Sequence, residues 1–312
     1  IYQSLLTSAL PVGLFAVLYQ INPLINQRIY YYYFNRLNEN NEFIFSKAEV
    51  WGNYYGIFLV IIGILTAFVS MIFMKSSRAI SASWVREEHR AGKEQLMQAI
   101  TGTIVAAVPL AALTAVLAEP IASLLEIGDK EITMKLLQSG SVLLVLFAFS
   151  YFWFDLLKQF KRTVQMLLLA GGGFLVHIIS LIVIMPLIND VEQLIMGIIA
   201  ANIIGASFSF VLGFFLVARM LKYQGEWINK NIRTLAITIL CSAIAGLMAL
   251  FLSKGILNLV GPAVTILICL VISIIAYFIL MMLFRGLTVG ELDRLPGGQL
   301  LIKIGRLFRF YY

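Results

Sequence analysis

The residues of this chain whose types suit chemistry are a few polar side chains inside long apolar segments. The segment 5–34 contains Gln20, Asn22, Asn26 and Arg28. Asn22 and Asn26 are four residues apart, so they share one face of a helix. Polar groups within an apolar segment are costly and tend to face a cavity. We therefore take these four residues as candidate substrate-binding residues.

Arg28 has two interpretations. Beside the two asparagines, its guanidinium is suited to the phosphate groups of a substrate. Alternatively, its long side chain extends out of an apolar layer to the phosphates of lipid headgroups. The sequence leaves both interpretations open.

Two further polar residues occur in the apolar segments 164–186 and 194–217. His177 lies in the first and Asn202 in the second. A histidine in this setting can relay protons or bind a substrate, or it can be a packing residue whose ring is hydrogen-bonded. Asn202 has the same alternatives. Both complete the set of candidate cavity residues.

Signatures of catalysis and of metal binding are missing from the sequence. There is no CxxC, and His89 and His177 are far apart, so no metal-ligand spacing occurs. No phosphate-binding P-loop and no serine–histidine–acid signature is present. Cys241 and Cys269 lie in separate apolar segments and are expected to be small buried residues. We expect no catalytic residue, no metal, no cofactor and no enzymatic activity.

The composition shows what must position these residues. The chain has 312 residues, of which 61% are hydrophobic and 12% charged. Soluble domains average about 45–50% apolar and about 25% charged residues. Disordered chains are poor in hydrophobic residues, and membrane β-barrels have short alternating segments rather than long apolar runs. The composition therefore predicts an all-α polytopic membrane helix bundle.

Eight segments are long enough to cross a bilayer, which takes roughly 20 apolar residues in a helix. They lie at 5–34, 54–74, 97–118, 136–157, 164–186, 194–217, 234–253 and 262–284. Because the loops alternate between the two sides, 17 of the 23 basic residues fall on one side, with a net charge of +10 against −3 on the other. The positive-inside rule places the +10 side in the cytoplasm. Both termini are then cytoplasmic, and the net charge of +7 does not indicate a nucleic-acid partner.

Small residues recur at helical spacing. Ala201, Gly205, Ser209 and Gly213 form one face of a helix that another helix can approach closely, and Gly52 and Gly56 have the same spacing. The run 171–173 is three glycines, which suits either a hinge or a close crossing. The segment 75–95 is predicted to be a charged cytoplasmic connection. The tail 299–310 has the pattern of an amphipathic helix on an anionic membrane surface.

The order of these segments resembles the multidrug/oligosaccharidyl-lipid/polysaccharide exporter superfamily, in particular its polysaccharide flippase, lipid II flippase and stage V sporulation protein B branch. SALPVGLFAVLYQINPLINQRIY is similar to the seventh helix of that family, and AEVWGNYYGIF, with its Gly-x-Tyr, to the start of the eighth. LAEPIASLL resembles the end of the ninth helix, and LTVGELDRLPGGQLLIKIGRLF the tail of the sporulation branch. Asn26 stands where the family usually has Asp, which argues against a carboxylate-dependent coupling role at that position.

The resemblance implies a domain organisation and a function. Residues 1–217 would form the C-terminal lobe of six membrane helices, 218–284 two additional membrane helices, and 285–312 a cytoplasmic amphipathic tail. The N-terminal lobe would precede Ile1 in a longer protein. Family members move lipid-linked oligosaccharides or peptidoglycan precursors, carried on a polyprenyl diphosphate, across the cytoplasmic membrane by alternating access. A cation-coupled multidrug antiporter of the same superfamily and a non-transporting membrane accessory protein remain alternatives.

Overall fold

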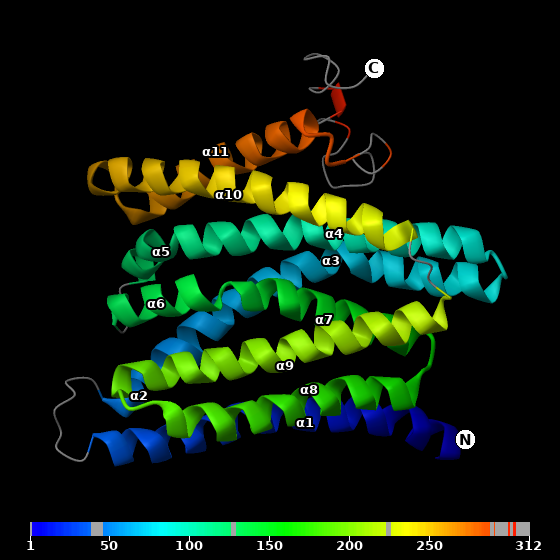
Figure 1. The fold of residues 1–312 in the computed structure, drawn as a ribbon, viewed down its shortest axis with the longest axis horizontal. Helices are drawn as coiled ribbons and strands as arrows, with labels where there is room; N and C mark the ends of the chain where they lie inside the picture. Colours follow the sequence, from blue (N-terminus) through cyan, green and yellow to red (C-terminus); the bar gives the residue numbers. More distant parts are fainter. Residues whose placement is uncertain are drawn as a thin grey trace. The chain divides into compact units, whose positions relative to one another are not determined.

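The computed structural model describes residues 2–38, 46–125, 129–222 and 226–287, together with positions 290, 299, 302 and 303. Throughout this part of the chain the regular structure is helical, and no strand occurs (Figure 1). The side chains of 2–12, 14–16, 18–20, 72 and 226–231 lie outside the description. The predicted all-α helix bundle is confirmed.

Seven helical stretches are long and apolar enough to cross a membrane. They are Lys47–Met71, His89–Val116, Val142–Gln159, Thr163–Leu187, Val191–Met220, Ile232–Val260 and Pro262–Leu283. Each overlaps one of the predicted spans. The remaining predicted span, 5–34, lies within α1 (Tyr2–Leu37), a helix of 36 residues whose length exceeds the roughly 20 residues that a crossing needs. The chain is thus a multi-pass membrane protein.

Two predicted connections are much shorter than the sequence suggested. α3 (Leu59–Val85) continues through most of the segment 75–95, and α4 (His89–Val116) begins within it. Only 86–88 form the turn, where Glu87 has a φ of 63°. Similarly, α10 (Glu226–Val260) continues to Val260, and α11 (Pro262–Leu283) starts two residues later. Charged and polar residues here lie in the ends of long helices, so the polarity of these segments did not indicate long loops.

Contacts within the chain define two compact units, which comprise 1–70 with 127–222 and 71–126 with 223–312. The first unit contains α1, α2 (Lys47–Gly52), η1 (Asn53–Phe58), the start of α3, α6 (Lys130–Gly140), α7 (Val142–Gln159), α8 (Thr163–Ile184), η2 (Met185–Leu187) and α9 (Val191–Met220). The second contains the rest of α3, α4, α5 (Ala118–Leu125), α10 and α11. The expected division at 217 and 284 follows chain order and stays a prediction.

Glycines let α8 and α9 of the first unit lie side by side (Figure 1). A Cβ added to Gly205 would lie 2.8 Å from Cβ of His177 and 3.0 Å from the carbonyl oxygen of Gly173. A Cβ on Gly173 would collide with Oγ of Ser209, and one on Gly213 would collide with the indole of Trp153. The small-residue face of α9 is therefore a packing face. No described residue of a neighbouring helix lies within 4 Å of a Cβ added to Gly52 or Gly56, so no described helix makes the predicted close approach there.

The glycine run in α8 serves a close crossing. α8 is a continuous helix, and Gly173 contacts α9 where no larger residue would fit. Gly172 faces the ring of Phe208, with 3.0 Å between that ring and an added Cβ, whereas Gly171 has open space around it.

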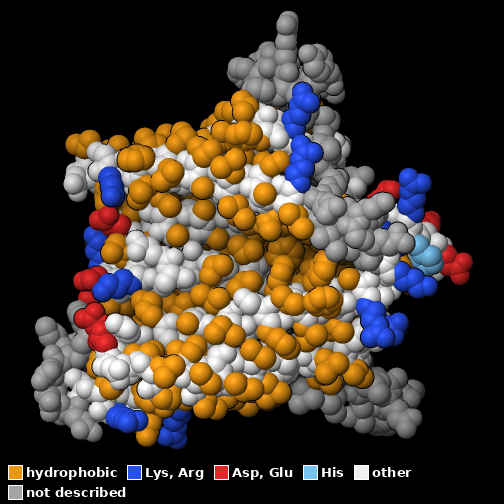
Figure 2. All heavy atoms as spheres, in the orientation of Figure 1, with side chains coloured by type: hydrophobic (Ala, Val, Ile, Leu, Met, Phe, Trp, Pro, Cys, Tyr) orange, Lys and Arg blue, Asp and Glu red, His pale blue; other side chains and the backbone are white. Residues whose placement is uncertain are grey.

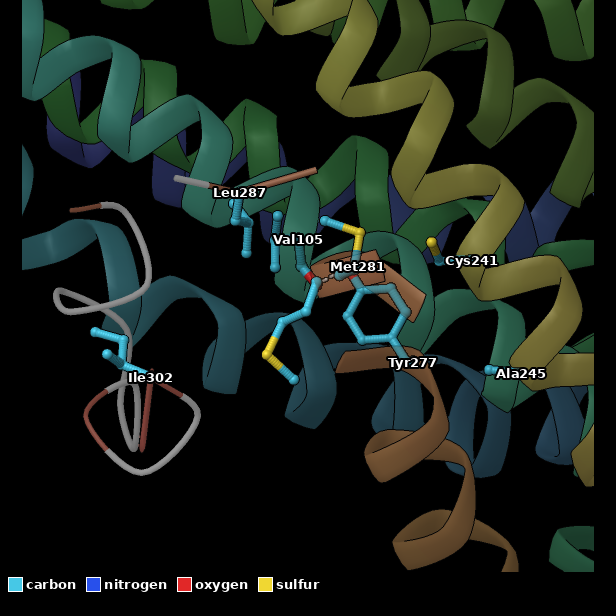
Figure 3. Packing of buried hydrophobic residues seen from close by; sticks show 8 residues of the cluster. Val105, Cys241, Ala245, Tyr277, Met281, Leu287 and Ile302 are labelled. Carbon is cyan, nitrogen blue, oxygen red and sulfur yellow. Dashed lines mark hydrogen bonds between the residues drawn. The ribbon is translucent and has the colours of Figure 1, made fainter. Parts of the chain in front are cut away.

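The second unit has its own apolar core between α4, α10 and α11 (Figure 3). Tyr277 points toward α4, where its hydroxyl donates to the carbonyl oxygen of Val105 at 3.1 Å. Cys241 belongs to this core, and Cys269 to a second cluster with Leu113 and Leu117. Both cysteines are fully buried and free, as expected from their apolar segments.

Candidate functional site

A buried hydrogen bond joins two of the candidate residues in the first unit. Nε2 of His177 on α8 lies 2.8 Å from Oδ1 of Asn26 on α1, so a proton on Nε2 donates to the amide oxygen. The exposed fractions of these residues are 4% and 2%. Because α1 and α8 pack directly against each other, the bond lies within the helix contact rather than on its edge.

A second buried hydrogen bond involves Asn202 on α9. Its Nδ2 donates to the hydroxyl oxygen of Tyr54 at 2.7 Å and to the carbonyl oxygen of Ile198 at 3.0 Å. Both amide hydrogens are thereby used. The Asn26 side chain also lies close to the Tyr54 hydroxyl. His177 with Asn26 and Asn202 with Tyr54 are thus two buried hydrogen-bonded pairs in the same unit, and we call these four residues the polar network.

Tyr54 was missing from the candidates derived from residue types. It is 1% exposed and lies in η1, a stretch of π-helix between α2 and α3. π-helical turns are rare and frequently occur at functional sites. The available signal was the Gly-x-Tyr of the segment 48–58, in which the tyrosine is Tyr54. Tyrosine is common at the ends of membrane spans, which hid its role.

His177 is held between α1 and α9. On one side its ring contacts Asn26, and on the other its backbone faces Gly205 so closely that any side chain would collide. The second ring nitrogen, Nδ1, is buried, and the backbone of Ala201 lies near the ring but outside hydrogen-bonding geometry. Among the described residues, Nε2 of His177 therefore has a hydrogen-bond partner and Nδ1 has none.

Asn22 lies one turn before Asn26 and is half-buried. Its Oδ1 is buried without a hydrogen-bond partner among the described residues. The shared face predicted for Asn22 and Asn26 agrees with both side chains being directed inward. Gln20 is part of α1, but its side chain lies outside the described residues.

Arg28 is separated from the polar network. Its side chain is exposed, whereas Asn26 is buried. Two residues along an α-helix correspond to a rotation of about 200°, so the two side chains leave α1 on opposite faces. The structure therefore brings together Asn26, His177 and Asn202 and leaves Arg28 outside. Its role as a substrate-binding cation stays a prediction.

An aromatic cluster borders the polar network. Tyr30 stacks on Trp51 with ring centroids 5.9 Å apart, and Trp51 contacts Tyr54 at 5.3 Å. Tyr54 in turn stacks on Phe58 at 5.9 Å. The rings fix the position of Tyr54 and bury the hydroxyl of Tyr30 without a hydrogen-bond partner among the described residues.

The arrangement is uncharged and suits hydrogen bonding rather than metal binding. Among the described residues no group of three or more His, Cys, Asp or Glu side chains lies close enough to hold a metal ion. In comparisons with known proteins, no family model, no curated protein and no solved structure matches this chain.

Proposed function

We propose that this chain is part of a membrane transporter that moves lipid-linked oligosaccharides or peptidoglycan precursors across the cytoplasmic membrane by alternating access. The observation that carries the proposal is the polar network, whose buried hydrogen bonds join α1 to α8 and η1 to α9 inside a membrane-spanning bundle. Buried polar groups in such helices are costly and tend to serve a substrate path.

The chemistry of the polar network suits a hydroxyl-rich and amide-rich substrate. Its members are two asparagines, a tyrosine and a histidine, and no carboxylate belongs to it. This favours a sugar-bearing substrate over an organic cation, since cation-coupled antiport generally relies on intramembrane carboxylates. The resemblance of the sequence to polysaccharide and lipid II flippases supports the same substrate class. It also supports a second, N-terminal lobe as the partner that completes a cavity.

Alternating access requires helices that exchange packing partners. Polar bonds between helices suit this role because they can be broken and replaced by bonds to substrate or water, whereas the glycine contacts of α8 and α9 keep those helices together. We therefore assign substrate recognition to the polar network, with Asn22 as a further candidate because its Oδ1 has no hydrogen-bond partner among the described residues.

The test uses the product of the complete reading frame, reconstituted in liposomes with a fluorescent lipid-linked sugar. The assay measures how fast the label becomes accessible to a membrane-impermeant quencher. Tyr54→Phe removes the hydroxyl that accepts from Asn202. Tyr277→Phe is the matched control, because it removes an equally buried hydroxyl in the core of the second unit.

We expect flipping by the unmodified protein, a reduced rate for Tyr54→Phe and a nearly unchanged rate for Tyr277→Phe. One lost neutral hydrogen bond is worth about 1 kcal/mol, or about fivefold in an equilibrium. Equal rates for both variants would refute the role of the polar network. Absence of flipping together with dye efflux driven by an ion gradient would establish the antiporter instead. Absence of both activities would leave an accessory protein.

A further inference from the structure

One end of α1 carries two exposed arginines, and Glu39 and Glu42, which follow this helix in the sequence, are not among the described residues. Arg28 and Arg36 are exposed, and neither forms an ion pair with any described residue. The whole of α1 contains no Asp or Glu. Basic side chains lie over this end of α1 (Figure 2). The positive charge is therefore not compensated by its own helix.

The cations share a face with polar and aromatic residues. Asn35 is seven residues after Arg28 and so lies on the same face of α1, and Tyr32, which is 63% exposed, lies between them. Lys47 reaches this face from α2, because its Nζ donates to Oδ1 of Asn35 at 3.0 Å. The same ammonium lies 5.3 Å from the ring centre of Tyr31. We call Arg28, Arg36 and Lys47, with these neighbours, the basic face.

The basic face lies beside the start of the candidate span Lys47–Met71. Lys47 is the first residue of the span Lys47–Met71, and it contacts α1 at Tyr31 and Asn35. Arg28 is about 10 Å deeper, at 1.5 Å per residue, and an arginine side chain can extend back across much of that distance. Exposed tyrosines at this level are typical of the headgroup layer.

We propose that the basic face binds the phosphate headgroup of an anionic glycerophospholipid. Charge complementarity selects this occupant. The guanidiniums of Arg28 and Arg36 hold phosphate oxygens in a two-pronged manner, and Leu24, which is 62% exposed, lies one turn deeper, where an acyl chain would pass. The site is separate from the polar network, since it uses the opposite face of α1.

Two lysines of the same unit, Lys130 and Lys135, serve as controls for Arg28 and Arg36. Lys135 is paired with Glu131 at 2.9 Å and lies 3.7 Å from Glu192. The hydrogen bond to Glu131 raises the pKa of Lys135. Lys130 also has an interaction partner. Replacing these two lysines removes as much positive charge as replacing Arg28 and Arg36. In the part of the chain that the structure describes, however, both lysines, unlike the two arginines, already interact with other residues.

The test is native mass spectrometry of the purified protein with equal amounts of phosphatidylglycerol and phosphatidylcholine, and in a third arm undecaprenyl diphosphate. We expect the unmodified protein to retain phosphatidylglycerol over phosphatidylcholine. In Arg28→Gln/Arg36→Gln the ratio of bound phosphatidylglycerol to bound phosphatidylcholine should fall at least fivefold, since each cation near a membrane surface raises the affinity for anionic lipid by about fivefold. Lys130→Gln/Lys135→Gln should keep it.

Three outcomes would overturn the proposal. The first is an unchanged lipid preference in Arg28→Gln/Arg36→Gln. The second is an equal loss in Lys130→Gln/Lys135→Gln, which would mean that total charge decides. The third is retention of undecaprenyl diphosphate over phosphatidylglycerol that depends on Arg28 and Arg36, which would make the basic face a substrate site. Because both guanidinium side chains are exposed, their replacement leaves the packing of the unit intact.

Discussion

Nε2 of His177 and Oδ1 of Asn26 are 2.8 Å apart, although 151 residues separate them in the sequence. This hydrogen bond joins α1 to α8, so the loss of either partner is expected to weaken the packing of the two helices. Its contribution is measurable because each partner can be removed separately and then both together.

Asn26→Leu should destabilise the protein by about 1–3 kcal/mol, because it leaves the His177 nitrogen buried without its partner. His177→Leu should have a similar effect on the Asn26 oxygen. The double variant should be more stable than the sum of the two losses predicts, since neither orphaned group remains. Unfolding in mixed detergent micelles measures the three free energies. Strict additivity would show that the bond contributes no coupling.

Gly205→Ala should destabilise the first unit by about 1–3 kcal/mol, because the new methyl group meets Cβ of His177 and the backbone of Gly173, neither of which can move easily. Gly171→Ala is the control on the partner helix. Its Cβ meets open space, and alanine is the better helix former, so we expect a neutral or slightly stabilising effect. Thermal unfolding monitored by helix circular dichroism distinguishes the two. Similar shifts for both variants would contradict the close crossing.

Gly261→Ala should cost about 1–3 kcal/mol, because φ of 80° with ψ of 167° is a conformation that essentially only glycine adopts. Gly255→Ala lies nearby inside α10 with open space around it and should be tolerated. The comparison is made by the same unfolding assay. If Gly261→Ala were as stable as Gly255→Ala, the turn between α10 and α11 would have to adopt another backbone conformation.

The topology predicted from the basic residues is tested by cysteine labelling in intact cells. The native Cys241 and Cys269 are fully buried, so background labelling is expected to be low. A cysteine at position 130 should react with a membrane-impermeant reagent from outside. A cysteine at position 306 should react only after permeabilisation. Labelling of position 306 in intact cells would reverse the orientation.

The sequence was sufficient for the architecture, because long apolar segments have few alternatives to helices in a bilayer. The ends of the helices were harder to predict from the sequence. The structure continues α10 for seven residues beyond the predicted 253, through Lys254 and Asn258. It also divides the predicted span 136–157 at Ser141, where α6 ends and α7 begins. Hydropathy reports where the bilayer ends, whereas backbone hydrogen bonds decide where a helix ends.

The sequence predicted the residues of the candidate site but not how they pair. His177, Asn26 and Asn202 could be identified one by one, because a polar residue in an apolar segment is visible in a single sequence. Their pairing could not be identified, since it depends on how α1, α8 and α9 rotate against each other. The π-helical turn that directs Tyr54 toward Asn202 has no comparable signature in residue types.

The one-residue turn at Gly261 has a consequence for biosynthesis. α10 ends at Val260 and α11 begins at Pro262, so no hydrophilic loop separates the two helices. We therefore expect the two helices to insert into the bilayer together, as one helical hairpin.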